Sequence, residues 1–191
     1  HDADTVYVSF SNHKSGDFAP YLLRSRDRGV TWESITGDLP EREIVWSIAE
    51  DPVDPDLIFL GCEFGLYVTL DGGTEWFKIK SGMPTIAVRD VAIQAREGDL
   101  ALATFGRSFY ILDDYAALRD IDDTLFETPA KIFPTRRAYA YIAGSKGRGS
   151  TGATRYRASN PAFGATFTYW IRDKIETLAD QRKKAERERE K

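Results

Sequence analysis

Two acidic residues, Asp17 and Glu63, are the side chains of this sequence best suited to acid–base chemistry on a sugar. Two carboxylates about 5–10 Å apart can hydrolyse a glycosidic bond, one as acid and the other as base or nucleophile. Spacing along the chain does not set that separation, so catalysis is one hypothesis and a pair of solvated loop residues is the simpler one. The two histidines, His1 and His13, have no metal-ligand spacing, so no metal or cofactor is expected.

These acids belong to a larger set of side chains that we expect on one face of the protein. In a four-stranded antiparallel sheet, the loop between the second and third strands lies at the same end as the connection to the next sheet. Such segments here are residues 12–20, 62–64 and 105–107, with connections at 37–43 and 81–85. They collect a candidate ligand face of His13, Lys14, Asp17, Glu43, Glu63, Phe64, Phe105 and Arg107. The two phenylalanines provide apolar platforms for a glycan or a peptide segment.

The elements that carry this face are organised around a repeated turn. The pattern [Ser/Thr]-x-Asp-x-Gly-x-x-Trp occurs twice, with a spacing of 44 residues from Ser25 to Thr69. The aspartate can accept bonds from turn N–H groups, the glycine permits positive φ, and the tryptophan opens the next strand. We therefore predict a structural role, and no chemistry, for Ser25, Asp27, Gly29, Trp32, Thr69, Asp71, Gly73 and Trp76.

Short runs of β-forming residues flank these turns and predict an all-β fold. The strands are expected at 5–11, 21–24, 32–36, 44–50, 57–61, 65–70, 76–79, 88–94, 100–104 and 109–112. Grouped as three, four and three, they make about two and a half four-stranded blades of a β-propeller, whose usual repeat is about 40–50 residues. Because a propeller needs about four to eight blades, residues 1–143 are predicted to be an incomplete β-propeller that depends on further blades of a longer chain.

The sequence beyond residue 112 changes character. Residues 115–120 predict a helical turn, and 131–133 with 138–142 predict a last strand. The Gly/Ser-rich residues 144–153 indicate a linker, and the alternating run 165–170 within 154–172 predicts the first strand of a new β domain. Residues 173–191 predict a charged helix whose thin apolar stripe favours a solvated position over a partner-binding one.

Composition excludes several classes of protein. The chain has 191 residues, 42% of them hydrophobic and 13% aromatic, which is enough for a packed core. A formal net charge of −4 argues against a basic surface that binds nucleic acid. Because Cys62 is the single cysteine, the chain has no internal disulfide. No apolar run approaches the roughly 18 residues of a membrane span. Since residue 1 is a histidine and no signal peptide is visible, a segment of a longer protein is expected.

Three runs of the sequence resemble the C-terminal end of the propeller in large bacterial proteins with sortilin-like, neuraminidase-repeat (BNR, Asp-box) blades. The runs are residues 17–32, 51–73 and 104–114. These proteins are often labelled glycosyl hydrolases. Residues 160–165 resemble the beginning of their immunoglobulin-like domain. The resemblance implies an exported protein, periplasmic, secreted or at the cell surface. The chain departs from the pattern at Phe105, where these proteins commonly have histidine.

The function that we predict from these features is binding of a protein, peptide or glycan ligand by an exported propeller. A carbohydrate hydrolase of the xyloglucanase or sialidase type, with its carboxylates mostly outside this segment, is the alternative. A purely structural module at the cell envelope is the third possibility. Neither a nucleic acid nor a membrane span is expected among its partners.

Overall fold

A computed structural model describes residues 1–140, 158 and 163–189, which fall into two units. Of the described residues, the first unit contains 1–120, 158 and 163, and the second contains 121–140 and 164–189. The predicted linker at 144–153 lies outside the described residues, so the domain boundary at 143 and the immunoglobulin-like domain stay predictions.

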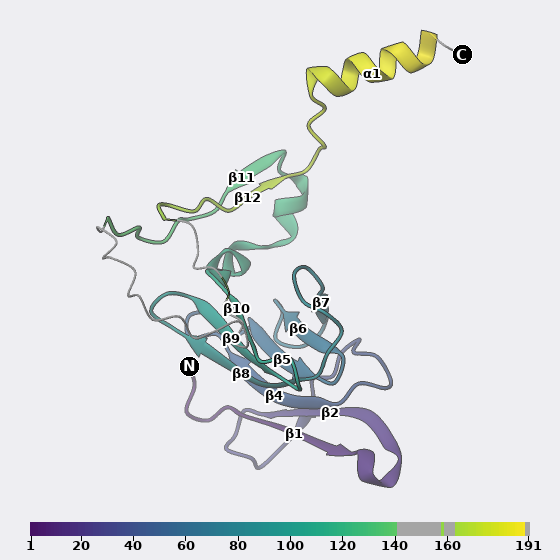
Figure 1. The fold of residues 1–191 in the computed structure, drawn as a ribbon. Helices are drawn as coiled ribbons and strands as arrows, with labels where there is room; N and C mark the ends of the chain where they lie inside the picture. The colour runs from purple at the N-terminus through teal and green to yellow at the C-terminus, as the bar shows by residue number, and fades with distance from the viewer. Residues whose placement is uncertain (141–157, 159–162, 190–191) are drawn as a thin grey trace, which may run out of the picture. The chain divides into compact units, whose positions relative to one another are not determined.

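The first unit is built from three antiparallel sheets that follow one another in sequence (Figure 1). The first sheet has the order β1-β2-β3, with β1 (Val6–Asn12), β2 (Asp17–Ser25) and β3 (Glu33–Ser34). The second has the order β4-β5-β6-β7, with β4 (Val45–Glu50), β5 (Ile58–Cys62), β6 (Gly65–Thr69) and β7 (Phe77–Ile79). The third has the order β10-β9-β8, with β8 (Val88–Gln94), β9 (Asp99–Thr104) and β10 (Phe109–Leu112). The three, four and three strands confirm the predicted all-β fold of consecutive propeller blades.

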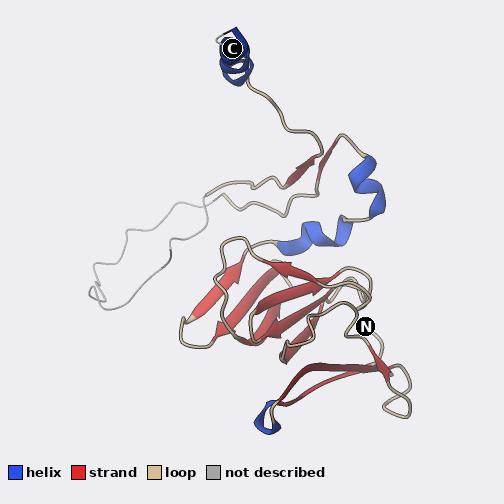
Figure 2. Cartoon of the chain, turned by 90° about the vertical axis from the view of Figure 1, so that its right-hand side faces the viewer, coloured by secondary structure: helices blue, strands red, loops and turns tan. Residues whose placement is uncertain are grey.

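The two central strands of the middle sheet, β5 and β6, are buried on both faces, because apolar cores shared with the first and third sheets cover them (Figure 2). Every residue of β5 is buried, and its side chains alternate between two apolar cores. Ile58, Leu60 and Cys62 join the core shared with the first sheet. Leu57 and Phe59 join the core shared with the third. The nearly continuous apolar run of this strand is the sequence signature of burial on both faces.

The repeated turn has the hydrogen bonds that its residue types require. The Asp71 carboxylate accepts from the Thr69 hydroxyl at 2.7 Å and from the N–H groups of Thr74 and Glu75 at 2.9 and 3.1 Å. Gly73 has a φ of 103°, and a Cβ there would lie 2.8 Å from Ile35 Cβ of the neighbouring sheet. The turn therefore also spaces the first and second blades.

The corresponding carboxylate of the first turn, Asp27, accepts from the N–H and the hydroxyl of Thr31 and from the Ser25 hydroxyl. These bonds lower the pKa of Asp27 to about 2. Burial acts to raise the pKa of Asp71, yet the bonds from Thr69 and the turn N–H groups lower it overall. Both carboxylates are thus engaged by their own turns.

Replacing Asp71 by alanine is expected to destabilise the second blade by about 1–3 kcal/mol, since turn N–H groups lose their acceptor. Asp71→Asn retains one acceptor oxygen and should have a smaller effect. Hydrogen exchange of the β6 and β7 amides in the full-length protein measures the difference. Unchanged exchange together with loss of a ligand would show that the aspartate acts in binding and not in the turn.

A buried ion pair connects the second blade to the segment that follows the third. Residues of the short helix η2 (Tyr115–Asp120) approach the end of β4, where the Asp51 side chain is completely buried. Arg119 donates to both Asp51 oxygens at 2.9 and 2.7 Å, and the Tyr115 hydroxyl donates at 2.6 Å. The predicted helical turn at 115–120 is confirmed, and it serves to close the apolar core beside the third sheet.

The second unit is small. It contains the short helix η3 (Asp123–Glu127), the paired strands β11 (Ala130–Ile132) and β12 (Tyr169–Ile171), and the helix α1 (Leu178–Arg189). Phe126 packs edge-on against Trp170, with ring centroids 5.4 Å apart. The charged helix is present, and none of its residues is buried. Among the described residues, no helix has both the length and the apolar character needed to cross a membrane.

Several predicted boundaries were wrong. Strand β2 begins at Asp17 because Asn12 and Asp17 pair across a tighter loop than the one expected up to Pro20. Helix α1 begins at Leu178 instead of residue 173, since Thr177 and Asp180 exchange side-chain and backbone hydrogen bonds that cap it. The strand expected at 165–170 is confined to β12, residues 138–140 are not in a strand, and η3 was not predicted.

Candidate functional site

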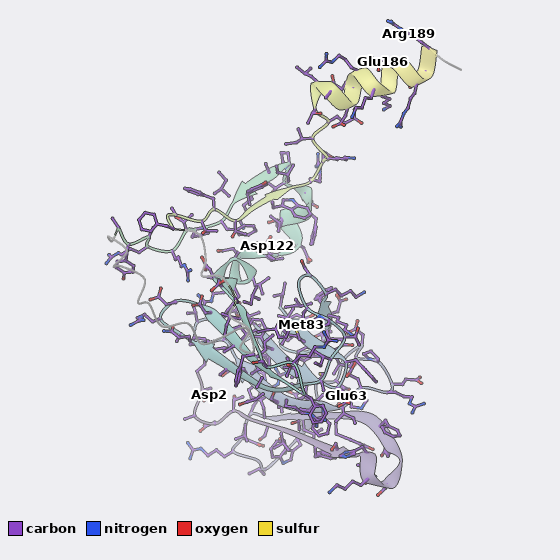
Figure 3. All side chains as sticks on the ribbon, in the orientation of Figure 1. Asp2, Glu63, Met83, Asp122, Glu186 and Arg189 are labelled. Carbon is purple, nitrogen blue, oxygen red and sulfur yellow. The ribbon has the colours of Figure 1, made fainter. Side chains whose placement is uncertain are left out.

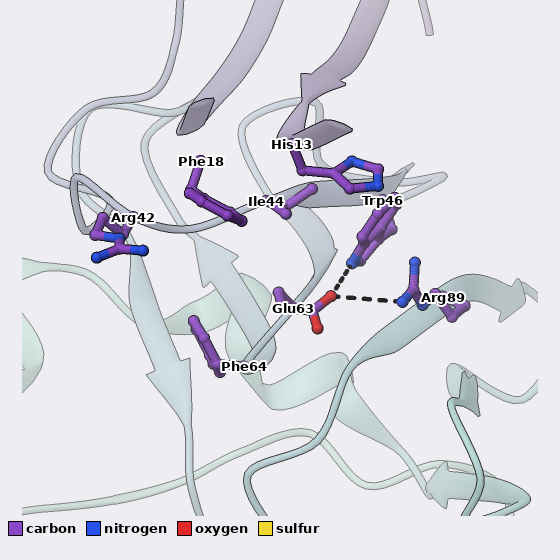
Figure 4. Close-up of a pocket in the computed structure, with 8 residues that line it drawn as sticks. All are labelled: His13, Phe18, Arg42, Ile44, Trp46, Glu63, Phe64 and Arg89. Carbon is purple, nitrogen blue, oxygen red and sulfur yellow. Dashed lines mark hydrogen bonds and ion pairs between the residues drawn. The ribbon is translucent and has the colours of Figure 1, made fainter. Parts of the chain in front are cut away.

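A pocket of about 530 Å³ lies at one end of the sheets of the first unit. All three sheets and their connections contribute side chains to it (Figure 4). The pocket is lined by His13, Phe18, Arg42, Ile44, Trp46, Glu63, Phe64 and Arg89. Its volume falls within the roughly 300–1,000 Å³ typical of small-molecule sites, and its lining combines aromatic rings with a few charged groups.

Two of these side chains come from irregularities at equivalent places in consecutive blades. The pairing of β4 with β5 shifts between Val45 and Ser47, which leaves Trp46 without a cross-strand partner. The pairing of β8 with β9 shifts in the same way around Arg89. A bulge of this kind redirects a side chain that a regular strand would hold on its face. Here both redirected side chains reach the pocket, where the Arg89 guanidinium carbon lies 3.8 Å from the Trp46 ring centroid.

Glu63 is held in a fixed orientation by these two residues. The Trp46 indole N–H donates to Glu63 Oε2 at 2.8 Å, and Arg89 Nη2 lies 3.6 Å from the same oxygen (Figure 4). Figure 3 labels Glu63 among the side chains of the described residues. No hydrogen bond or ion pair within the described residues engages the other oxygen, Oε1. The carboxylate therefore presents one free acceptor that its neighbours have already oriented.

The other aromatic side chains of the pocket differ in the contacts that hold them. His13 meets Trp46 edge-on, with centroids 5.5 Å apart, and its Nδ1 lies 3.1 Å from the Ser11 hydroxyl oxygen. The Arg42 guanidinium carbon lies 5.0 Å from the centroid of the Phe18 ring. Phe64 is 47% exposed, and no ring or cation contact within the described part of the chain covers it. Of the two phenylalanines that line the pocket, Phe64 is thus the more open to a ligand.

The predicted ligand face is only partly gathered in this pocket. His13, Glu63 and Phe64 line it together. Phe105 lies beside it, with its ring centroid 5.3 Å from the Arg89 guanidinium carbon. Lys14 and Arg107 are exposed but are not among the lining residues, so their part in ligand binding stays a prediction.

Asp17 and Glu43, the other two acids of that face, make hydrogen bonds within the protein. Asp17 accepts from the Tyr21 hydroxyl and the Ala19 N–H, and these bonds lower its pKa. Glu43 is buried and accepts from the Phe64 N–H at 3.0 Å and from the Tyr67 hydroxyl at 2.9 Å. Burial raises the pKa of Glu43. Their contribution to a ligand face stays a prediction, while their observed contacts position the loop around Phe64 and the start of β2.

The lining of the pocket contains one carboxylate, that of Glu63. Glycoside hydrolysis by the usual mechanisms needs two carboxyl groups on opposite sides of the bond. The described lining thus supplies one of the two carboxyl groups that this mechanism uses. In the described residues, no cluster of three or more histidine, cysteine or acidic side chains could hold a metal ion.

Five lining residues were not predicted from the sequence: Phe18, Arg42, Ile44, Trp46 and Arg89. Trp46 and Arg89 were assigned to regular strands, and nothing local to either strand reveals a bulge. A usable signal was the alignment of the two blades, since Val45-Trp46 and Val88-Arg89 occupy equivalent positions. Arg42 falls within the predicted connection 37–43, from which the candidate ligand face includes only Glu43.

No family model matches the chain. In sequence, it is 34% identical over 91 residues to a xyloglucanase of Acetivibrio thermocellus, a match that covers 42% of this chain and 11% of that protein. It is 30% identical over 120 residues to a xyloglucanase of a Paenibacillus species, covering 56% of this chain and 12% of that protein. The chain therefore spans about a tenth of the length of the curated relatives that it matches.

Solved structures of GH74 enzymes also match. The GH74 enzyme of Niastella koreensis covers 60% of this chain, with 14% sequence identity and a TM-score of 0.48. The GH74 xyloglucanase of Xanthomonas campestris covers 62% of this chain, with 23% identity and a TM-score of 0.45. The chain accounts for 19% and 21% of those structures.

Proposed function

We propose that this chain is part of a longer, exported β-propeller protein that acts on carbohydrates, and that its pocket binds a saccharide. The observation that carries the proposal is the oriented Glu63 carboxylate beside the open Phe64 ring. The apolar face of a sugar ring can pack on an aromatic side chain while its hydroxyls donate to an acceptor at the edge. The sequence similarity to xyloglucanases supports a glycan over the peptide and protein ligands that the sequence left open.

Replacing Phe64 by alanine should weaken saccharide binding by roughly tenfold, because the open platform is lost. Titration calorimetry of the full-length protein with oligosaccharides selected on a glycan array measures the change. Phe77→Ala is the matched control, since Phe77 is 53% exposed on β7 and does not line the pocket. Equal losses in both variants, or none in either, would count against a saccharide site here.

Hydrolysis is the second candidate, and it is favoured by the name of the similar proteins. If the protein cleaves glycans, this pocket serves as a binding subsite unless a second carboxylate reaches it from elsewhere. Glu63→Gln distinguishes the two functions when release of reducing ends is measured beside binding. Loss of turnover with binding retained would assign Glu63 to catalysis, whereas loss of binding by a protein without turnover would assign it to recognition.

A further inference from the structure

Arg42 places a positive charge in the pocket that no acid of the described residues neutralises. Its side chain comes from the connection before β4, and it contacts the Phe18 ring. No hydrogen bond or ion pair joins its guanidinium to another described residue. Arg89, in contrast, is paired with Glu63 at 3.6 Å. The donors of Arg42 are thus available, while those of Arg89 are partly engaged.

We propose that the saccharide bound here carries a carboxylate, as a uronic acid residue does, and that Arg42 binds this carboxylate. The inference rests on the proposed function and specifies its ligand. A guanidinium presents its N–H donors in a planar fork that matches a carboxylate with two parallel hydrogen bonds. The Phe18 ring packs against the guanidinium and leaves its N–H edges available for that contact.

The balance of charge in the pocket favours an anionic ligand. The lining carries two arginines and one carboxylate, although the whole chain has a net charge of −4. After the pair between Arg89 and Glu63 is taken into account, the charge of Arg42 remains. Arg42 is exposed at the edge of the pocket, with the Phe18 ring beside its guanidinium. A neutral sugar would leave this cation to the solvent, whereas a uronate would neutralise it.

The positions of the polar groups also define how such a ligand lies. Arg42 and Arg89 stand on opposite sides of the pocket, with Phe18 and Ile44 between them (Figure 4). The free oxygen of Glu63 can accept a sugar hydroxyl while the carboxylate of the ligand contacts Arg42. Two polar contacts separated by an apolar floor fix both the orientation and the chemical class of the saccharide.

The experiment compares acidic and neutral forms of the same sugars. Oligosaccharides of galacturonate, glucuronate and mannuronate are each paired with their carboxyl-reduced counterparts. Their affinities for the full-length protein are measured by calorimetry for the wild type, Arg42→Gln and Arg42→Lys. Arg96→Gln is the matched control, because Arg96 is an exposed arginine outside the pocket. We expect at least one acidic form to bind about tenfold or more tightly than its reduced form.

Arg42→Gln should abolish this preference, with a much larger loss of affinity for the acidic form than for the reduced form, and Arg42→Lys should restore part of the preference. Equal affinity for acidic and neutral forms, or a preference that survives Arg42→Gln, would overturn the inference. In that case the proposed saccharide site still stands if Phe64→Ala weakens binding. Absence of binding to every oligosaccharide, or binding of a peptide carboxylate in their place, would overturn both the inference about Arg42 and the proposed saccharide site.

Discussion

Replacing Asp51 by alanine is expected to lower the stability of the first unit by about 3–5 kcal/mol, because the change leaves a largely buried arginine without its counter-charge. Asp51 is completely buried, and the side chain of Arg119 is only 20% exposed. The same carboxylate also accepts the N–H groups of Val53 and Asp54, both at 2.8 Å. One side chain therefore joins the β4–β5 turn to the segment that follows the third blade.

The way in which the stabilisation by Asp51 depends on pH follows from the direction in which its pKa is shifted. Burial acts to raise the pKa of Asp51, but the hydrogen bonds from Arg119 and Tyr115 lower it overall below the ordinary 3.8. A carboxyl whose folded pKa is lowered stabilises the fold above its unfolded pKa, and this stabilisation is lost as the pH falls through the folded value. The difference between wild type and Asp51→Asn should therefore be full at neutral pH and shrink below about pH 4.

Hydrogen exchange of the β4 and β9 amides in the full-length protein measures these differences without assuming a single unfolding transition. Arg119→Met supplies the control, because it removes the cation and keeps much of the apolar stem. If Asp51 and Arg119 act as a pair, the double variant Asp51→Asn/Arg119→Met should lose less stability than the sum of the losses in the two single variants. Strictly additive effects would show that the two residues stabilise the fold independently.

Local sequence signals predicted the elements whose geometry is set locally. The Asp71 turn was predicted because its acceptor, its positive-φ glycine and its tryptophan all lie within eight consecutive residues, from Thr69 to Trp76. The apolar run of β5 indicated a strand for a similar reason. The start of α1 also has a local signal that the prediction from residue 173 did not use, since Thr177 and Asp180 have the spacing of a capping box.

The site was less predictable because its residues are placed by contacts between blades. Trp46 and Arg89 reach each other only through two bulges on different sheets, and a bulge depends on the partner strand. Topology predicted that the loops of His13 and Glu63 share one end of the sheets, and both residues line the pocket. It could not show that Glu43, one connection away, is buried. The ion pair of Asp51 with Arg119 joins residues 68 positions apart, and no local pattern encodes it.

Glu43 is the residue whose replacement should disturb both the stability of the second blade and the shape of the pocket. Glu43→Ala removes the acceptor for the Tyr67 hydroxyl and for the Phe64 N–H, and the Tyr67 side chain is buried. Each polar group left unpaired in a buried site costs about 1–3 kcal/mol, so the loss of the acceptor for both groups should cost about 2–6 kcal/mol. Since Phe64 is the open platform of the pocket, saccharide affinity should fall in the same variant.

Glu43→Gln separates the hydrogen bonds from the charge. The amide oxygen can still accept from the Phe64 N–H, so the affinity for a saccharide should stay close to that of the wild type. Because burial raises the pKa of Glu43 above the ordinary 4.5, the wild-type carboxyl favours the fold most when protonated, and it loses that advantage as the pH rises through the folded pKa. Exchange of the β5 and β6 amides should therefore show Glu43→Gln gaining stability relative to wild type as the pH is raised above about 4.5. A pH-independent difference, or a Glu43→Ala variant that binds saccharide normally, would show that this buried acid does not position Phe64.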